Sequence, residues 1–355
     1  MKNFEKFRSV LEEKNLDGLL LTSRVHRFYC VEHDLAEGTV LLTREQCLYF
    51  TDARYIEDAE RNLKDATPVL TTGARPMEQL LKEAAQQAGL QTLGYEEQAL
   101  TVAEFKQFQA LLQTQWVPCQ KELEAFRAAK EPWELERMQQ AQRITDQAFS
   151  DLLCVIQPGI TEKQLAAELI YRLFRFGGEM LSFDPIVVSG PNTSMPHGVP
   201  GDRVLQKGDF VTMDFGCKYR GYCSDMTRTV ALGTATEQMR EVYEVVLQAQ
   251  LAGIAATRAG LCGQQIDAAA RRVITEAGFG EYFGHGYGHS LGLEIHEAPY
   301  CNQKGTTPFP ARAVCSSEPG IYLPGNFGVR IEDVVVFTDD GCTVLTNSPK
   351  ELLIL

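Results

Sequence analysis

The feature that most constrains this 355-residue chain is a weak internal repeat in its C-terminal two-thirds. The segment QPGITEKQLAAEL at 157–169 aligns with RAGLCGQQIDAAA at 258–270, at a constant separation of 101 residues. Gly159 matches Gly260, and each precedes a stretch with apolar residues at helical spacing. The repeat therefore predicts two copies of one structural unit that begins with a helix.

Carboxylates recur with nearly the same separation. Asp214 is followed 104 residues later by Glu318, and Asp225 is followed 107 residues later by Glu332. Between the two aspartates the sequence reads as a strand, a turn around Arg220–Gly221 and a returning strand, which would bring both carboxylates side by side. Two such halves folded face to face would enclose a pocket lined by four carboxylates.

A fifth candidate ligand, His289, lies in the glycine-punctuated segment HGYGHSLGLEIHEAP. Glu332 lies in the apolar strand pattern GVRIEDVVVF, where an unpaired charge would be unfavourable. Four carboxylates and one imidazole form a hard, oxygen-rich set with enough charge for two divalent cations, and such a set indicates metal-activated water. A single Asp or Glu near a turn is more often solvated or capping, so the prediction depends on the joint pattern.

Composition excludes several other classes of protein. The net charge of −13 argues against a broad nucleic-acid-binding surface. The first residues show no secretory signal peptide, and no apolar run reaches the roughly 18 residues that a membrane span needs. The ten cysteines include no CxxC pair, so we expect free thiols in a cytoplasmic protein, with Cys217 and Cys223 packed in a core.

The N-terminal part, residues 1–122, has the pattern of an α/β domain without a chemical motif, and its His26 and His33 are expected to be structural or peripheral. Helices are predicted near Phe4–Glu13, Tyr55–Leu63, Met77–Ala88 and Val102–Leu112, and strands in DGLLLTS, GTVLLT, QCLYFT and Thr92–Tyr95. A long helix that starts at Pro132 then opens a second domain, residues 123–355.

The segments DFGCKYRGYCSDMTRT, GHSLGLEIHEAP, SEPGIYLP and GVRIEDVVV resemble the motifs of the pita-bread metallopeptidases, in their order and spacing. Within that group the chain is most similar to the Xaa-Pro aminopeptidase and prolidase branch. The resemblance extends to the N-terminal region and implies an α+β protein. A C-terminal pita-bread domain with pseudo-twofold duplicated helix-hairpin units would follow an α/β N-terminal domain of the creatinase type.

The same resemblance implies roles for individual residues. Asp225 and Glu332 would bridge two metal ions, Asp214 would bind one of them, and His289 with Glu318 would complete the other. Oxygen-dominated coordination favours Mn²⁺, with Co²⁺ and Zn²⁺ as alternatives. Glu318 would also act as the proton shuttle. His197 and His296 match histidines that contact the substrate and would help to stabilise an oxyanion. Further substrate contacts are expected from His285, Arg330 and Tyr322.

The branch resemblance implies hydrolysis of Xaa-Pro bonds in proline-containing peptides, with release of the N-terminal residue. Relatives are commonly dimers or larger, so we expect a homodimer. The net charge and the apolar pattern predict no nucleic-acid or membrane partner. Some prolidases carry an arginine four residues after the second motif histidine, where this chain has Tyr300. That departure favours peptides longer than two residues, with a dipeptide-specific prolidase as the alternative. A methionine aminopeptidase would share the five ligands, but its common short form lacks an N-terminal domain like residues 1–122. The five intact ligands disfavour two further alternatives, a creatinase-like amidinohydrolase and a non-catalytic pita-bread binding module.

Overall fold

The computed structural model describes residues 3–355, which divide into one compact unit that ends at Phe126 and a second that begins at Arg127. The predicted boundary near residue 122 falls slightly earlier, within helix α6 (Gln120–Ala128). Both units combine helices with strands, so the predicted α+β class is confirmed. No helix within the described residues is long and apolar enough to cross a membrane.

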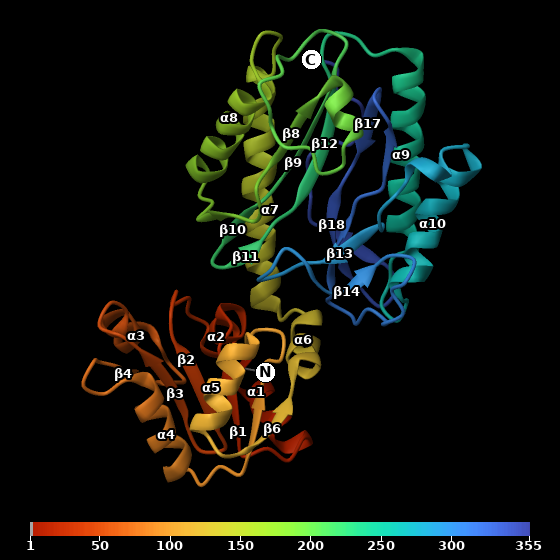
Figure 1. Ribbon diagram of the computed structural model, residues 1–355. Coiled ribbons are helices and arrows are strands. Elements are labelled where there is room, and N and C mark those ends of the chain that lie inside the picture. Colours follow the sequence, from red (N-terminus) through yellow and green to blue (C-terminus); the bar gives the residue numbers. More distant parts are fainter. Residues whose placement is uncertain (1–2) are drawn as a thin grey trace. The chain divides into compact units, whose positions relative to one another are not determined.

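The first unit, coloured red to orange in Figure 1, is built on a six-stranded sheet in the order β4-β3-β2-β1-β5-β6. Strand β1 pairs antiparallel with β2 and parallel with β5, so the sheet is mixed. Its strands are β1 (Gly18–Leu21), β2 (Thr39–Thr43), β3 (Cys47–Thr51), β4 (Thr67–Leu70), β5 (Thr92–Tyr95) and β6 (Gln115–Pro118). Its helices are α1 (Asn3–Glu13), α2 (Arg24–Val31), α3 (Ile56–Asn62), α4 (Met77–Gln87), α5 (Val102–Leu111) and α6.

The two histidines of this unit have local partners. His26 is buried in α2, and its Nδ1 lies 2.5 Å from Oε1 of buried Glu96. His33 Nε2 lies 2.9 Å from Oδ2 of Asp58. Glu96 also accepts hydrogen bonds from the backbone of Thr22 and Ser23, which fixes the start of α2. These contacts give both histidines a structural place in the first unit.

The second unit contains two similar halves, seen in Figure 1 as a helix pair on either side of a set of strands. In the first half, α7 (Pro132–Leu152) and α8 (Glu162–Arg175) pack on the sheet β12-β9-β8. Its other elements form the small sheet β11-β10-β7 and two short 3₁₀ helices. The bounds are η1 (Leu153–Val155), β7 (Met180–Leu181), β8 (Ile186–Ser189), η2 (Gly190–Ser194), β9 (Phe210–Phe215), β10 (Cys217–Tyr219), β11 (Tyr222–Cys223) and β12 (Met226–Ala231).

In the second half, α9 (Glu237–Ala256) and α10 (Gly263–Glu276) share a core with the five-stranded sheet β14-β13-β15-β18-β19 and the hairpin β16-β17. The bounds are η3 (Gly280–Tyr282), β13 (Gly288–Ser290), β14 (Glu297–Cys301), β15 (Val314–Ser317), β16 (Gly320–Leu323), β17 (Phe327–Arg330), β18 (Asp333–Phe337) and β19 (Cys342–Val344). Each half therefore has its own helix pair and its own apolar core.

The internal repeat of the sequence is reproduced in three dimensions. Helices α8 and α10 are each 14 residues long, and each begins with a capping box. Gly159 donates its N–H to the carbonyl of Leu205 at 3.1 Å, and Gly260 donates to the carbonyl of Phe309 at 2.9 Å. Both glycines have positive φ angles, 100° and 85°, which explains why glycine recurs before each helix.

The predicted strand GVRIEDVVVF is interrupted in the structure. Strand β17 ends at Arg330 and β18 begins at Asp333, with Ile331 and Glu332 between them. The break arises because β17 pairs with β16, whereas β18 pairs with β15. Glu332 therefore lies at a junction between two sheets and not inside one strand.

Candidate metal centre

The repeated unit places its two carboxylates at equivalent positions in each half. Asp214 lies near the end of β9, and Asp225 directly precedes the returning strand β12. Glu318 directly follows β15, and Glu332 directly precedes β18. The predicted strand, turn and returning strand are present, with Arg220 and Gly221 at positive φ in the turn. Both halves thus direct a carboxylate pair towards one site.

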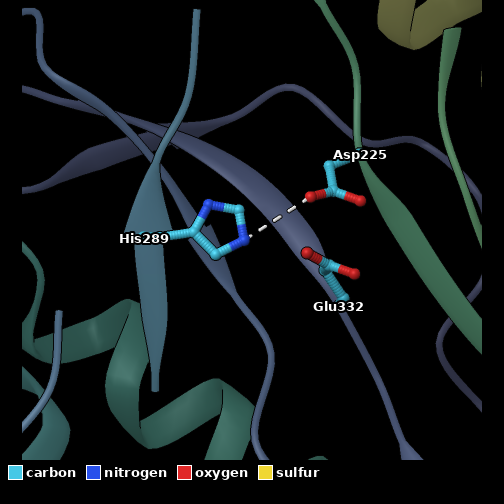
Figure 2. A group of neighbouring side chains, drawn as sticks. All are labelled: Asp225, His289 and Glu332. Carbon is cyan, nitrogen blue, oxygen red and sulfur yellow. Dashed lines mark ion pairs between the residues drawn. The ribbon is translucent and has the colours of Figure 1, made fainter. Parts of the chain in front are cut away.

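Three of the five predicted ligands form a tight group. One ligand atom from each of Asp225, His289 and Glu332 lies within 4.8 Å of the others. Figure 2 shows the imidazole of His289, on β13, pointing at the carboxylates of Asp225 and Glu332. The Nε2 atom of His289 is 3.8 Å from Oδ2 of Asp225.

The other two predicted ligands line the same cavity, whose volume is about 550 Å³. Glu318 Oε1 lies 3.3 Å from His289 Nε2 and accepts a hydrogen bond from Ser316 Oγ at 3.0 Å. Asp214 Oδ2 accepts from Arg330 Nη2 at 2.7 Å. The structure therefore brings all five together, with Asp214 and Glu318 each held by a neighbouring side chain.

The electrostatics of this cluster are dominated by buried negative charge. Burial, and then repulsion by Glu332 and Asp214, holds the pKa of Asp225 well above its usual value. Burial, followed by repulsion from Glu318 and Asp214, does the same to the pKa of Glu332. Burial would also raise the pKa of Glu318, but the hydrogen bond and charge of His289 outweigh it and lower that pKa to about 2.

Divalent metal ions fit this donor set. Within residues 3–355, the Oδ1 atoms of Asp214 and Asp225 are buried without a hydrogen-bond partner. His289 Nδ1 lies 3.3 Å from the Ser290 carbonyl and donates to it, so Nε2, which faces the carboxylates, is the nitrogen that would lose its proton and offer a lone pair to a metal ion. Orphaned carboxylate oxygens and an imidazole lone pair that converge on one point match the requirements of a hard divalent cation.

The predicted substrate contacts form a hydrogen-bonded relay beside the metal ligands. His285 Nδ1 lies 2.8 Å from the Gly286 carbonyl and must donate to it, so Nε2 accepts from the hydroxyl of Tyr322 at 2.9 Å. That hydroxyl accepts in turn from Arg330 Nη1 at 2.9 Å. Burial lowers the pKa of His285, which agrees with a neutral ring. Tyr322 lies behind His285 and is not among the described residues that line the cavity.

His197 and His296, which the resemblance implies as substrate contacts, are exposed loop residues that line the cavity. The ring of His296 meets that of His289 edge to face, with 4.4 Å between centroids. Burial lowers the pKa of His296, and the charge of His289 adds to the effect. The cavity also has an apolar wall, formed by Phe183, Pro185, Ile186, Val199, Pro200 and Ile295.

Thr227 is a site residue that the sequence reasoning missed. Its Oγ1 donates to Glu332 Oε2 at 2.7 Å and accepts from Arg330 Nε at 3.0 Å. It therefore joins the first half to a ligand of the second. Its position two residues after Asp225 could have revealed it, because residues two apart near a strand share a face.

The duplicated fold and the buried carboxylate–imidazole cluster define a metal-dependent hydrolase of the pita-bread class. Residues 136–339 match the description "Metallopeptidase family M24", and residues 4–129 match "Creatinase/Prolidase N-terminal domain". The chain belongs to metallopeptidase family M24, and the predicted class of fold and of enzyme is confirmed. Membership of this family implies divalent metal ions.

Similar proteins span the full length of the chain. An uncharacterized peptidase, YqhT, of Bacillus subtilis is 37% identical over 352 residues, which cover 99% of each chain. The structure of an Xaa-Pro dipeptidase from Bacillus anthracis has a TM-score of 0.96 and 39% identity, and covers 100% of this chain and 99% of its own. That of an X-Pro aminopeptidase from Thermotoga maritima has a TM-score of 0.94 and 32% identity, with 100% of both chains covered. Similar proteins thus include both an Xaa-Pro dipeptidase and an X-Pro aminopeptidase.

Proposed function

We propose that this protein is a dinuclear metal-dependent peptidase that hydrolyses Xaa-Pro bonds and releases the N-terminal residue of proline-containing peptides. The observation that carries the proposal is the buried group Asp225, His289 and Glu332, with Asp214 and Glu318 in the same cavity. The names of its relatives, an Xaa-Pro dipeptidase and an X-Pro aminopeptidase, support specificity for a bond to proline.

In this proposal the two metal ions would be held by five residues, namely Asp214, Asp225, His289, Glu318 and Glu332. The ions, best matched by Mn²⁺ with Co²⁺ and Zn²⁺ as alternatives, would activate water and polarise the scissile carbonyl when bound. The partnerless oxygens of Asp214 and Asp225 support this assignment, since a cation would balance them.

The other side chains would position the substrate and move protons. Glu318 lines the cavity next to His289 and would accept a proton from water for transfer to the leaving nitrogen. The rings of His197 and His296 lie on the cavity wall, where a donor could stabilise the developing oxyanion. Arg330 and Tyr322 hold His285 in one tautomer, ready to contact the peptide.

The charges around the cavity favour peptides longer than two residues. A dipeptide would place the free carboxylate of its proline next to the cavity, where a cationic partner would be needed. The lining includes Arg330, but this guanidinium already binds Asp214 and Tyr322. Tyr300, which lines the cavity and is 46% exposed, carries no charge. Dipeptide specificity is the alternative, and the name of the Bacillus anthracis relative supports it.

The test is hydrolysis by metal-stripped protein of Ala-Pro and of Ala-Pro-Ala, with and without Mn²⁺. We expect metal-dependent release of alanine from the tripeptide, at a kcat/KM at least about tenfold above that for the dipeptide, and loss of activity in Asp225→Asn. Preference for Ala-Pro would make the protein a dipeptidase. Failure to cut either peptide with any divalent ion would overturn the proposal of proline specificity.

A further inference from the structure

A second hollow adjoins the candidate active site. It has a volume of about 240 Å³ and shares His285, Gly286 and Asn302 with the lining of the larger cavity. Its other lining residues come from the second half of the fold; they are Arg271, Phe283, Gly284, Gln303 and Lys304. A peptide bound in the larger cavity could therefore continue past His285 and Asn302 into this hollow.

The two spaces differ in charge. The larger cavity is lined by five acidic residues, namely Asp184, Asp214, Asp225, Glu318 and Glu332. The described lining of the smaller hollow has no acidic residue and includes two cations, Arg271 and Lys304. In a chain with a net charge of −13, a hollow of this sign beside an acidic site favours a negatively charged ligand group.

Only one of these cations is available to a ligand. The guanidinium of Arg271 forms a two-point ion pair with Asp267, at 2.7 and 3.0 Å, and donates to the carbonyls of Phe283 and His285. The ammonium of Lys304, in contrast, forms no hydrogen bond or ion pair with any described residue, and its side chain is exposed. Lys304 is therefore the free positive charge of the hollow.

Asn302 fixes the segment that carries this lysine. Its Oδ1 accepts from the N–H of Lys304 at 2.9 Å, and its carbonyl accepts from the N–H of Gly305 at 3.0 Å. The amide nitrogen of Asn302 has no hydrogen-bond partner among residues 3–355, so it too can donate to a ligand. An amide donor beside an ammonium is a suitable pair for a carboxylate.

We propose that Lys304, with Asn302, binds the C-terminal carboxylate of a tripeptide substrate in the hollow next to the active site. The inference rests on the proposed function and extends it to a substrate class, short peptides with a free carboxylate one residue beyond the proline. The hollow adjoins the larger cavity at His285, Gly286 and Asn302, whereas Lys304 lines the hollow alone, so the carboxylate that it binds would belong to the residue after the proline.

The experiment compares Ala-Pro-Ala with its C-terminal amide as substrates of the full-length, Mn²⁺-loaded protein. For Lys304→Met we expect KM for the free acid to rise about fivefold, the effect of one partly exposed ion pair, while kcat and the kinetics of the amide stay unchanged. Lys304→Arg keeps the charge and should stay close to wild type. Lys207→Met removes another exposed lysine of the second unit, outside both lined spaces, and serves as the matched control.

An equal change for the acid and the amide, or no change for either, would overturn the role of Lys304 while leaving the proposed function intact. If the wild-type protein cuts neither peptide, the proposed function fails, and the substrate subsite fails with it. A KM change for the free acid in Lys207→Met as large as in Lys304→Met would also overturn the assignment, since it would show a general effect of charge.

Discussion

Asp225 is a fully enclosed carboxylate whose neighbours are other carboxylates, and burial followed by this repulsion keeps its pKa well above the usual value. The folded, metal-free protein thus binds this proton more tightly than the unfolded chain, whose Asp pKa is about 3.9. The stability of the metal-free protein should therefore fall as pH rises above about 4 and through the raised pKa. In this range the unfolded chain has already released the proton that the folded protein still binds, so rising pH favours the unfolded state.

Asp225→Asn removes the charge and should stabilise the metal-free protein at pH 8, by on the order of 1 to 3 kcal/mol in the free energy of unfolding. The gain should shrink towards pH 5, where the wild-type carboxyl is more fully protonated. Thermal or urea unfolding in the presence of a chelator at both pH values measures this. A variant less stable than wild type at pH 8 would contradict the destabilising effect of the buried charge of Asp225.

At the residue scale, the sequence predicts the site residues that lie in motifs bounded by turns, but it does not predict the side chains that hydrogen-bond to them. Asp214 and Asp225 could be paired because a turn with glycine separates two strand patterns. Tyr322 could be placed near the site but not behind His285, because sequence spacing does not say which side of a ring a neighbour occupies. The role of Thr227 depends on Arg330 and Glu332, over 100 residues away, and a local pattern cannot show such contacts.

At the element scale, the loop of residues 291–296 between β13 and β14 presents His296 to the cavity. Glu297, the residue directly after this loop, hydrogen-bonds to the loop backbone. One oxygen of this buried carboxylate accepts from the N–H of Leu293 at 3.0 Å, and the other accepts from Lys130 Nζ at 2.9 Å. The geometry of a histidine loop thus depends on an ion pair that does not touch the metal ligands.

We predict that Glu297→Gln lowers the free energy of unfolding by about 3 to 5 kcal/mol, because two buried cations, Lys130 and Arg127, both lose this carboxylate as a partner. The kcat/KM for the tripeptide should fall about tenfold, since His296 is less well placed. Adding Lys130→Met should recover part of the stability but not the activity. Unfolding curves and kinetics on the three proteins test this, and full recovery of activity in the double variant would contradict a positioning role.

The elements that sequence patterns missed have a physical explanation. Strands β4 and β6 each contain a proline, Pro68 and Pro118, and proline weakens a strand pattern. Both strands lie at the two edges of their sheet, where a missing N–H donor is tolerated. The sequence around Ile331–Glu332 predicts one continuous strand because its apolar pattern continues across the change of sheet.

At the scale of the whole molecule, the repeat allowed the two-halved architecture of the second unit to be predicted, since a separation of 101 residues implies a duplicated unit. The hollow around Lys304 could not be anticipated in the same way. It is lined by residues 283–286 and 302–304 together with Arg271, and the pairing of β13 with β14 brings these two segments close to each other.

The division of the chain into two units leads to a prediction about its unfolding. All five candidate ligands lie after Arg127, and each unit has its own apolar core. A ligand that binds only one folded unit stabilises that unit, by about 2.7 kcal/mol at a concentration one hundred times Kd. Calorimetry should therefore resolve two transitions, of which Mn²⁺ raises the temperature of one and leaves the other in place.

Asp225→Asn is the control for this experiment, because it should abolish the Mn²⁺-dependent shift while both transitions persist. The shifted transition can be assigned by limited proteolysis between the two transition temperatures, which should leave a resistant fragment that begins near Arg127 when Mn²⁺ is present. A single transition that moves as a whole with Mn²⁺ would mean that the two units unfold as one cooperative body. In that case stabilisation by the metal would extend to the first unit, although none of the five candidate ligands lies there.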